Sequence, residues 1–181
     1  PSIGRLCDTV LRYAREKKGI VYAIDIRHAE HIAAYYRKHG IDAVAISAKT
    51  SGEERCRLIE QFKAGDTQVL VNVDLFGEGF DCPDVEFIQL ARPTLSLSKY
   101  LQQVGRGMRV FDGKRYCLIL DNVGLYRLFG LPSEDRDWQA MFEGTLAGKA
   151  HLKQTEERNV YAAFSVLGDT GRTVTADART E

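Results

Sequence analysis

Two arginines in the middle of the chain have a spacing that suits phosphate chemistry. They belong to the run Gln102-Gln103-Val104-Gly105-Arg106-Gly107-Met108-Arg109, which continues a stretch of helical periodicity. Because residues three apart share a helix face, Arg106 and Arg109 are predicted to hold two guanidinium groups side by side. Their fixed charge would stabilise the negative charge that develops as a terminal phosphoryl group is transferred. The plain alternative is a helix that ends at Gly105, with surface arginines beyond it.

A second candidate segment lies upstream, directly after a predicted strand. Gly77 and Gly79 fall within three residues, which indicates a tight backbone path where N–H groups can approach a ligand. Asp81 ends this path, and Pro83 follows two residues later. The Asp81 carboxylate could accept hydrogen bonds from ribose hydroxyls or orient a catalytic water. It could equally cap N–H groups within an ordinary turn.

The elements that must position these residues alternate between helix and strand. Helical periodicity predicts helices at 6–18, at 28–39, from Ser51 to just before Gly65, and from Ser96 or Ser98 through 104. Short apolar runs predict strands at 20–26, 43–46, 68–73, 85–90 and 115–120. Since these runs are continuously apolar, they indicate a parallel sheet covered on both faces by helices. The fold class is therefore α/β, doubly wound, with its ligand edge expected at the carboxyl ends of the strands.

The pattern changes near residue 123. Residues 1–123 are predicted to form the α/β domain, 124–167 a partly helical extension, and 168–181 a weakly ordered tail of small polar residues. Within the extension, Trp138 and Phe142 have a spacing that would dock it onto the domain.

Composition limits the classes of protein that fit. The chain has 181 residues, with 25 basic and 25 acidic side chains. Zero net charge counts mildly against nucleic-acid binding, although a local groove of basic side chains can hold phosphates on a neutral protein. No apolar run is long enough to span a membrane. The four cysteines form no C-x-x-C pair, which favours a cytoplasmic protein and argues against a disulfide framework or zinc site.

The two candidate segments, in this order on this fold, resemble the C-terminal RecA-like domain of superfamily-two (DEAD/DEAH-type) helicases. Residues 69–81 resemble the fifth motif of that family, 102–109 match its sixth motif Q-x-x-G-R-x-x-R, and 21–29 resemble its fourth. The resemblance covers about residues 5–123. Residues 118–138 resemble a bacterial and phage subgroup of DNA-repair-like and restriction-like helicases. The implied fold is a RecA-like doubly wound parallel sheet with helices on both faces, plus a C-terminal extension.

The resemblance assigns roles to individual residues. Arg106 and Arg109 would be arginine fingers acting on ATP, Gln102 and Gly105 would contact the nucleotide, and Gly79 and Asp81 would lie at the interdomain cleft near the ribose. Nucleic-acid contacts are expected from loops after strands, at Arg27, Ser47, Lys49, Thr50 and Asn72. Val73 stands where the family often has Thr, so one hydroxyl contact is absent and Asn72 is the expected substitute.

Two motifs that ATP hydrolysis requires do not occur in the sequence. There is no G-x-x-x-x-G-K-S/T and no D-E-x-H/D, and the Gly113-Lys114-Arg115 run does not qualify. The phosphate cradle and the Mg²⁺ ligands are therefore expected in an N-terminal RecA-like domain of the same full-length chain. We accordingly expect ATP and Mg²⁺ as cofactors, no activity from this fragment alone, and no metal ligand within it.

The function that fits best is the second motor domain of an ATP-dependent helicase or translocase, with DNA favoured over RNA as its partner. A non-catalytic RecA-like module that binds nucleic acid or protein is the main alternative, although such a module would not need the Arg106/Arg109 pair. A small-molecule enzyme on a Rossmann-like sheet ranks last, because no G-x-G-x-x-G follows the first predicted strand.

Overall fold

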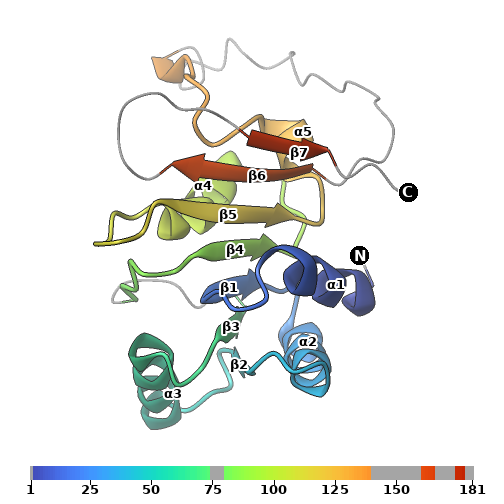
Figure 1. Ribbon diagram of the computed structural model, residues 1–181, viewed down its shortest axis with the longest axis vertical. Coiled ribbons are helices and arrows are strands. Elements are labelled where there is room, and N and C mark those ends of the chain that lie inside the picture. Colours follow the sequence, from blue (N-terminus) through green and yellow to red (C-terminus); the bar gives the residue numbers. More distant parts are fainter. Residues whose placement is uncertain (1, 74–79, 140–159, 166–173, 178–181) are drawn as a thin grey trace.

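The computed structural model describes residues 2–73, 80–139, 160–165 and 174–177. Helices and strands alternate from residue 3 to residue 72, as predicted, and the next described element is again a strand; Figure 1 labels each element. Their bounds are α1 Ile3–Tyr13, β1 Gly19–Tyr22, α2 Ile26–Lys38, β2 Ala43–Ile46, α3 Gly52–Ala64, β3 Val69–Asn72, β4 Phe87–Leu90, α4 Leu97–Gly107, β5 Tyr116–Asp121, α5 Leu125–Phe129, β6 Val160–Ser165 and β7 Val174–Asp177.

Side-chain caps set where the four long helices begin. The side chains of Ser2, Asp25, Ser51 and Ser96 each accept a hydrogen bond from the backbone N–H three residues later. The Ser2 cap starts α1 earlier than predicted. The Asp25 cap starts α2 at Ile26, so β1 is shorter than the predicted strand.

Helix α3 begins and ends where the sequence predicts. The N–H of Glu54 donates to the Ser51 hydroxyl at 3.2 Å. A reciprocal capping box is not completed, because the Glu54 carboxylate accepts hydrogen bonds from Arg57. Gly65 ends the helix with a φ of 88°, a left-handed conformation that costs glycine little.

The sheet confirms the doubly wound α/β prediction and extends it. Strand order is β2-β3-β1-β4-β5-β6-β7, and the first five strands are parallel. Strands β6 and β7 continue the sheet in antiparallel orientation, which the sequence did not predict. Strand β7 lies within residues 168–181, where weak order was expected. Most of the predicted helical extension, residues 140–159, lies outside the described residues.

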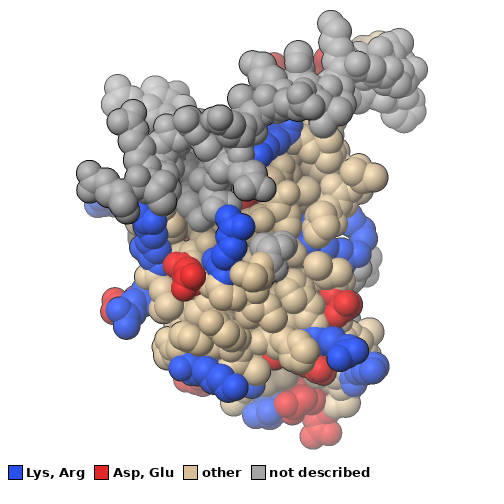
Figure 2. Space-filling view, turned by 90° about the vertical axis from the view of Figure 1, so that its right-hand side faces the viewer, with Lys and Arg blue, Asp and Glu red and all other residues tan. Residues whose placement is uncertain are grey.

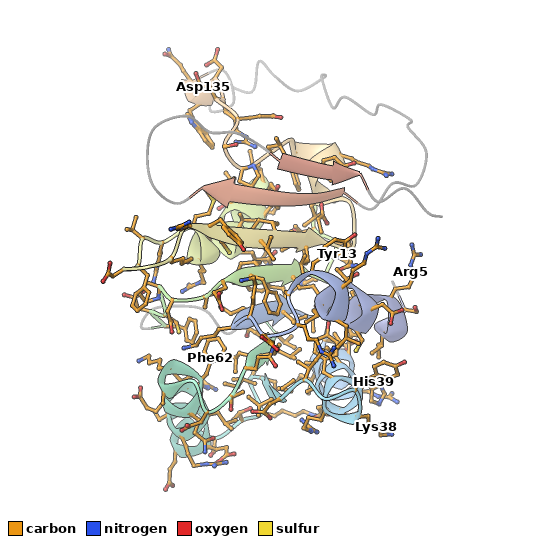
Figure 3. All side chains as sticks on the ribbon, in the orientation of Figure 1. Arg5, Tyr13, Lys38, His39, Phe62 and Asp135 are labelled. Atoms are coloured by element: carbon orange, nitrogen blue, oxygen red, sulfur yellow. The ribbon has the colours of Figure 1, made fainter. Side chains whose placement is uncertain are left out.

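Helices cover both faces of the sheet and enclose two apolar cores. Helices α1 and α2 pack on one face, and α3 and α4 on the other (Figure 1). Neighbouring residues of a strand point to opposite faces, so Ile20 enters the core with Phe62 and Tyr100, whereas Val21 enters the core with Tyr36. In Figure 3, Phe62 lies on the α3 side of the sheet.

A buried polar network joins α1 and α2 to the central strand β4. The Gln89 side chain is fully buried and accepts a hydrogen bond from the Tyr36 hydroxyl at 2.5 Å. It also donates to the carbonyl of Leu6 and to the Asn122 side chain, both at 2.9 Å. Because a buried amide without partners is costly, this network favours one position of both helices on the sheet.

Three of the four cysteines are core residues. Cys7, Cys82 and Cys117 are buried thiols, whereas Cys56 is exposed on α3. Across the part of the chain that the structure describes, no helix has the length and apolar character needed to cross a membrane.

Candidate functional site

The two segments with predicted chemistry meet in space. The Arg106 guanidinium donates from Nη1 to the carbonyl of Phe80 at 2.7 Å and lies 6.0 Å from the centre of the Phe80 ring. The Arg109 guanidinium forms an ion pair with the Asp81 carboxylate. These four residues (Phe80, Asp81, Arg106 and Arg109) therefore form one group of contacts, which we call the arginine cluster. Gly79, the other predicted residue of that segment, lies outside the described residues.

The arginines come together in a different way from the one predicted. Arg106 lies in the last turn of α4, the helix ends at Gly107, and Met108 is its C-cap. Arg109 therefore lies beyond the helix and does not share a helix face with Arg106. The alternative of a helix that stops at Gly105 is also wrong. The turn after the helix, together with Asp81, positions the second guanidinium.

The two glycines of the motif serve different purposes. A side chain at Gly107 would overlap its neighbours, because an added Cβ would lie 2.4 Å from Cys117 Sγ and 2.6 Å from Ile88 Cγ1. Gly107 thus allows α4 to lie directly on β4 and β5. An added Cβ at Gly105 would meet nothing within 4 Å. Gly105 and Gln102 are exposed, three residues apart on the open face of α4.

The arginine cluster lies away from the carboxyl ends of the strands, contrary to the general expectation for this fold. The Lys114 ammonium donates to the carbonyls of both Arg109 and Pro83, at 3.1 and 2.7 Å. Next to Pro83, the Asp84 carboxylate pairs with Lys18 Nζ at 2.6 Å, just before β1 begins. The segment after Asp81 therefore runs toward the amino ends of the strands, and the cluster lies beside the end of α4.

Local contacts also set the ionisation of this segment. Burial raises the pKa of the Cys82 thiol to about 12. Burial alone would raise the pKa of Asp84 as well, but hydrogen bonds from Cys82 and Lys18 hold that pKa below its usual value. Asp84 is thus held as a carboxylate that fixes the chain between Asp81 and β4.

The residues predicted to contact nucleic acid lie at the other edge of the sheet, where β1, β2 and β3 end. Ser47, Lys49 and Thr50 follow β2, and Arg27 lies in the first turn of α2 after β1. The parallel register places Ile46 beside Asn72, and Asn72 beside Tyr22, so the ends of β2, β3 and β1 are neighbours. The topology therefore gathers these loops at one edge, as predicted.

The turn after β2 is held by its own hydroxyl groups. The N–H of Ser47 donates to the Thr50 hydroxyl at 3.0 Å, and the N–H of Lys49 donates to the Ser47 hydroxyl at 3.2 Å. Both hydroxyls act as acceptors here, so each keeps a proton that it can donate. Ser47 is buried, whereas the side chains of Lys49 and Arg27 are exposed.

Asn72 differs from the other predicted nucleic-acid contacts, because the residue is only 1% exposed. In this conformation its side chain belongs to the buried end of β3, and its contact with a nucleic acid stays a prediction.

Figure 2 shows basic and acidic side chains scattered among uncharged residues, without a continuous basic surface on the face that it presents. A phosphate backbone there would depend on a few individual side chains and N–H groups.

The residues that the sequence did not reveal are those that hold the cluster in place. Phe80 and Lys114 carry no motif that marks them, and the Gly113-Lys114-Arg115 run does not match a phosphate-binding motif. Trp138, expected to dock the extension, is exposed, and its predicted partner Phe142 lies outside the described residues. The docking contacts come from Tyr100 instead, whose ring stacks on Phe129 and whose hydroxyl donates to the Gly130 carbonyl at 3.2 Å.

Comparison with known proteins decides the family. The model of the helicase conserved C-terminal domain matches residues 2–111, which is more than half of the chain. The chain belongs to the helicase conserved C-terminal domain family. The resemblance to the C-terminal domain of superfamily-two helicases is thereby confirmed.

Individual relatives extend this result. A 51.5 kDa protein of a Lactococcus phage is 39% identical over 141 residues, which are 78% of this chain and 31% of that protein. IRC3 of Saccharomyces cerevisiae, described as a candidate ATP-dependent helicase, is 35% identical over 108 residues, 60% of this chain and 16% of that protein. The chain thus spans less than a third of the length of these relatives.

A solved structure agrees with the family assignment. A fragment of a candidate HsdR subunit of a type I restriction enzyme from Vibrio vulnificus superposes with a TM-score of 0.60 and 26% identity. The match covers 72% of this chain and 28% of that one. Phage and restriction relatives are therefore both among the matches, in line with the subgroup that the sequence resembles.

Proposed function

We propose that this domain is the second motor domain of an ATP-dependent DNA helicase or translocase. The observation that carries the proposal is the convergence of Arg106 and Arg109 on Phe80 and Asp81, beside an open helix face that bears Gln102 and Gly105. Arg109 is 43% exposed at its side chain, so its guanidinium can exchange the Asp81 carboxylate for the phosphates of a nucleotide on a facing domain.

The facing domain is the N-terminal RecA-like domain of the full-length protein. It would hold ATP and Mg²⁺, because the sequence of this chain lacks both the phosphate cradle and the metal-binding motif. Arg106 and Arg109 would then stabilise the charge that develops on the transferred phosphoryl group. The fragment alone would hydrolyse ATP negligibly.

The other edge of the sheet would hold the nucleic acid. Lys49 and Arg27 are exposed there and would pair with phosphates, while the Ser47 and Thr50 hydroxyls and nearby N–H groups would donate hydrogen bonds. Contacts of this kind do not read the base sequence, which suits a protein that moves along a strand. ATP and nucleic acid would thus bind at separate edges of one rigid sheet.

The test is ATP hydrolysis by the full-length protein, with and without single- and double-stranded DNA, for the natural sequence and for Arg109→Ala. We expect DNA-stimulated hydrolysis and a loss of about a thousandfold in kcat in the variant. Arg15→Ala, an exposed arginine after α1, is the matched control and should retain full activity. Unchanged hydrolysis in Arg109→Ala would remove the finger assignment. A full-length protein that hydrolyses no ATP would favour the non-catalytic binding module.

A further inference from the structure

Lys114 is a buried cation whose partners are all backbone carbonyls. Its side chain lies in the loop between α4 and β5, and the residue is only 8% exposed. The ammonium donates to the carbonyls of Pro83 and Gly107 at 2.7 Å each, and to that of Arg109 at 3.1 Å. An ammonium has three N–H donors, so each of them has an acceptor.

These three carbonyls belong to the parts of the chain that form the arginine cluster. Gly107 is the last residue of α4, where a cation also stabilises the negative end of the helix dipole. Arg109 carries the exposed guanidinium, and Pro83 lies two residues after Asp81. One ammonium therefore fixes the backbone on both sides of the Arg109–Asp81 ion pair.

Burial of an ammonium is costly, so its presence calls for a reason. Burial lowers the pKa of Lys114, while nearby thiol and carboxylate groups act in the opposite direction. An apolar side chain of similar length could fill the same space without that cost. It could not hold three carbonyls at fixed distances, because it has no N–H to donate.

We propose that Lys114 is a positioning residue, which sets the backbone from which the Arg109 guanidinium reaches the nucleotide. The inference rests on the proposed role of Arg109 in ATP hydrolysis. Lys114 itself touches no substrate. Its effect on turnover passes through the carbonyl of Arg109, and its effect on the facing carboxylate passes through the carbonyl of Pro83.

The test is a double-mutant cycle in the full-length protein. Lys114→Met keeps the length of the side chain and removes its donors. We expect it to lower kcat for DNA-stimulated hydrolysis by about 10- to 100-fold, with little change in the KM for ATP, because a misplaced group weakens the transition state more than the ground state. In an Arg109→Ala background the same substitution should change kcat by less than about twofold. Lys63→Met, an exposed lysine on α3, is the control and should leave kcat unchanged.

A second variant keeps the inference testable if Lys114→Met folds poorly. Lys114→Arg keeps the charge, but its planar fork cannot direct N–H groups at three converging carbonyls in the same way. It should also lower kcat only when Arg109 is present. An equal loss of kcat in both backgrounds would assign Lys114 a merely structural role and overturn the inference. Unchanged kcat in both Lys114 variants would also overturn it. An Arg109→Ala protein with full activity would instead reject the proposed function itself.

Discussion

Arg109 and Asp81 form an ion pair across 28 residues of sequence, and this contact joins the turn after α4 to the segment after β3. The side chains are 43% and 72% exposed, so water screens the attraction and the pair contributes little to stability. The ion pair instead orients the Arg109 side chain, because it holds the guanidinium at one point on the surface.

Asp81→Asn should therefore separate stability from activity. We expect the free energy of unfolding of the domain to change by less than about 1 kcal/mol, because the pair is solvent-exposed. In the full-length protein we expect kcat for ATP hydrolysis to fall by about tenfold, since Arg109 loses the group that orients it. Urea unfolding and steady-state kinetics would measure the two effects. A large loss of stability with full activity would show that Asp81 is a structural residue only.

The two glycines of the sixth motif should respond oppositely to alanine. Gly107→Ala should destabilise the domain by about 1–3 kcal/mol, because the new methyl group would overlap Cys117 and Ile88. Gly105→Ala should stabilise it by up to about 1 kcal/mol, because the site is open and alanine favours the helix. Urea denaturation would report both changes. If Gly105→Ala also lowers ATPase activity in the full-length protein, the open face of α4 contacts the nucleotide or its domain.

Lys49 should contribute one phosphate contact to nucleic-acid binding. Lys49→Ala should weaken binding of single-stranded DNA equally for different sequences, and should reduce the slope of log affinity against log salt by about 0.7. Titration of a labelled oligonucleotide at several salt concentrations would measure this slope. Lys38→Ala is the control, because Lys38 lies in the last turn of α2, before β2 begins, whereas Lys49 follows β2. Equal slopes for both variants would exclude Lys49 from the interface.

The Lys18–Asp84 pair should make stability depend on pH in the acid range. The pKa of Asp84 is lowered in the folded chain, so its contribution is present above the unfolded pKa and is lost as pH falls through the folded pKa. Asp84→Asn should cost about 1 kcal/mol at pH 7 and progressively less below about pH 4. Urea unfolding of both proteins at pH 7 and pH 3 would show the difference. Glu60→Gln, which changes an exposed carboxylate on α3, should cost little at either pH. A cost for Asp84→Asn that does not vary with pH would contradict this account.

Local patterns in the sequence predicted much of the fold. Apolar runs located all five parallel strands to within a few residues, and Ser51 and Gly65 located the start and end of α3. Such signals are reliable because capping, helical periodicity and left-handed glycines depend on residues close in sequence. The predicted start of a helix was wrong where its N-cap lay outside the apolar stripe. Helix α1 is capped by Ser2 and begins at Ile3, whereas the apolar stripe predicted a start at residue 6.

The sequence by itself determined the family, the parallel core sheet and the identity of the arginine pair, because these follow from local spacing and residue type. Only the tertiary structure decided that Arg109 lies beyond its helix, that Asp81 is its partner, and that Lys114 fastens both segments. It also added β6 and β7 to the sheet. These contacts join residues far apart in the chain, and their geometry depends on how α4 and residues 80–86 pack against the sheet, which no local pattern specifies.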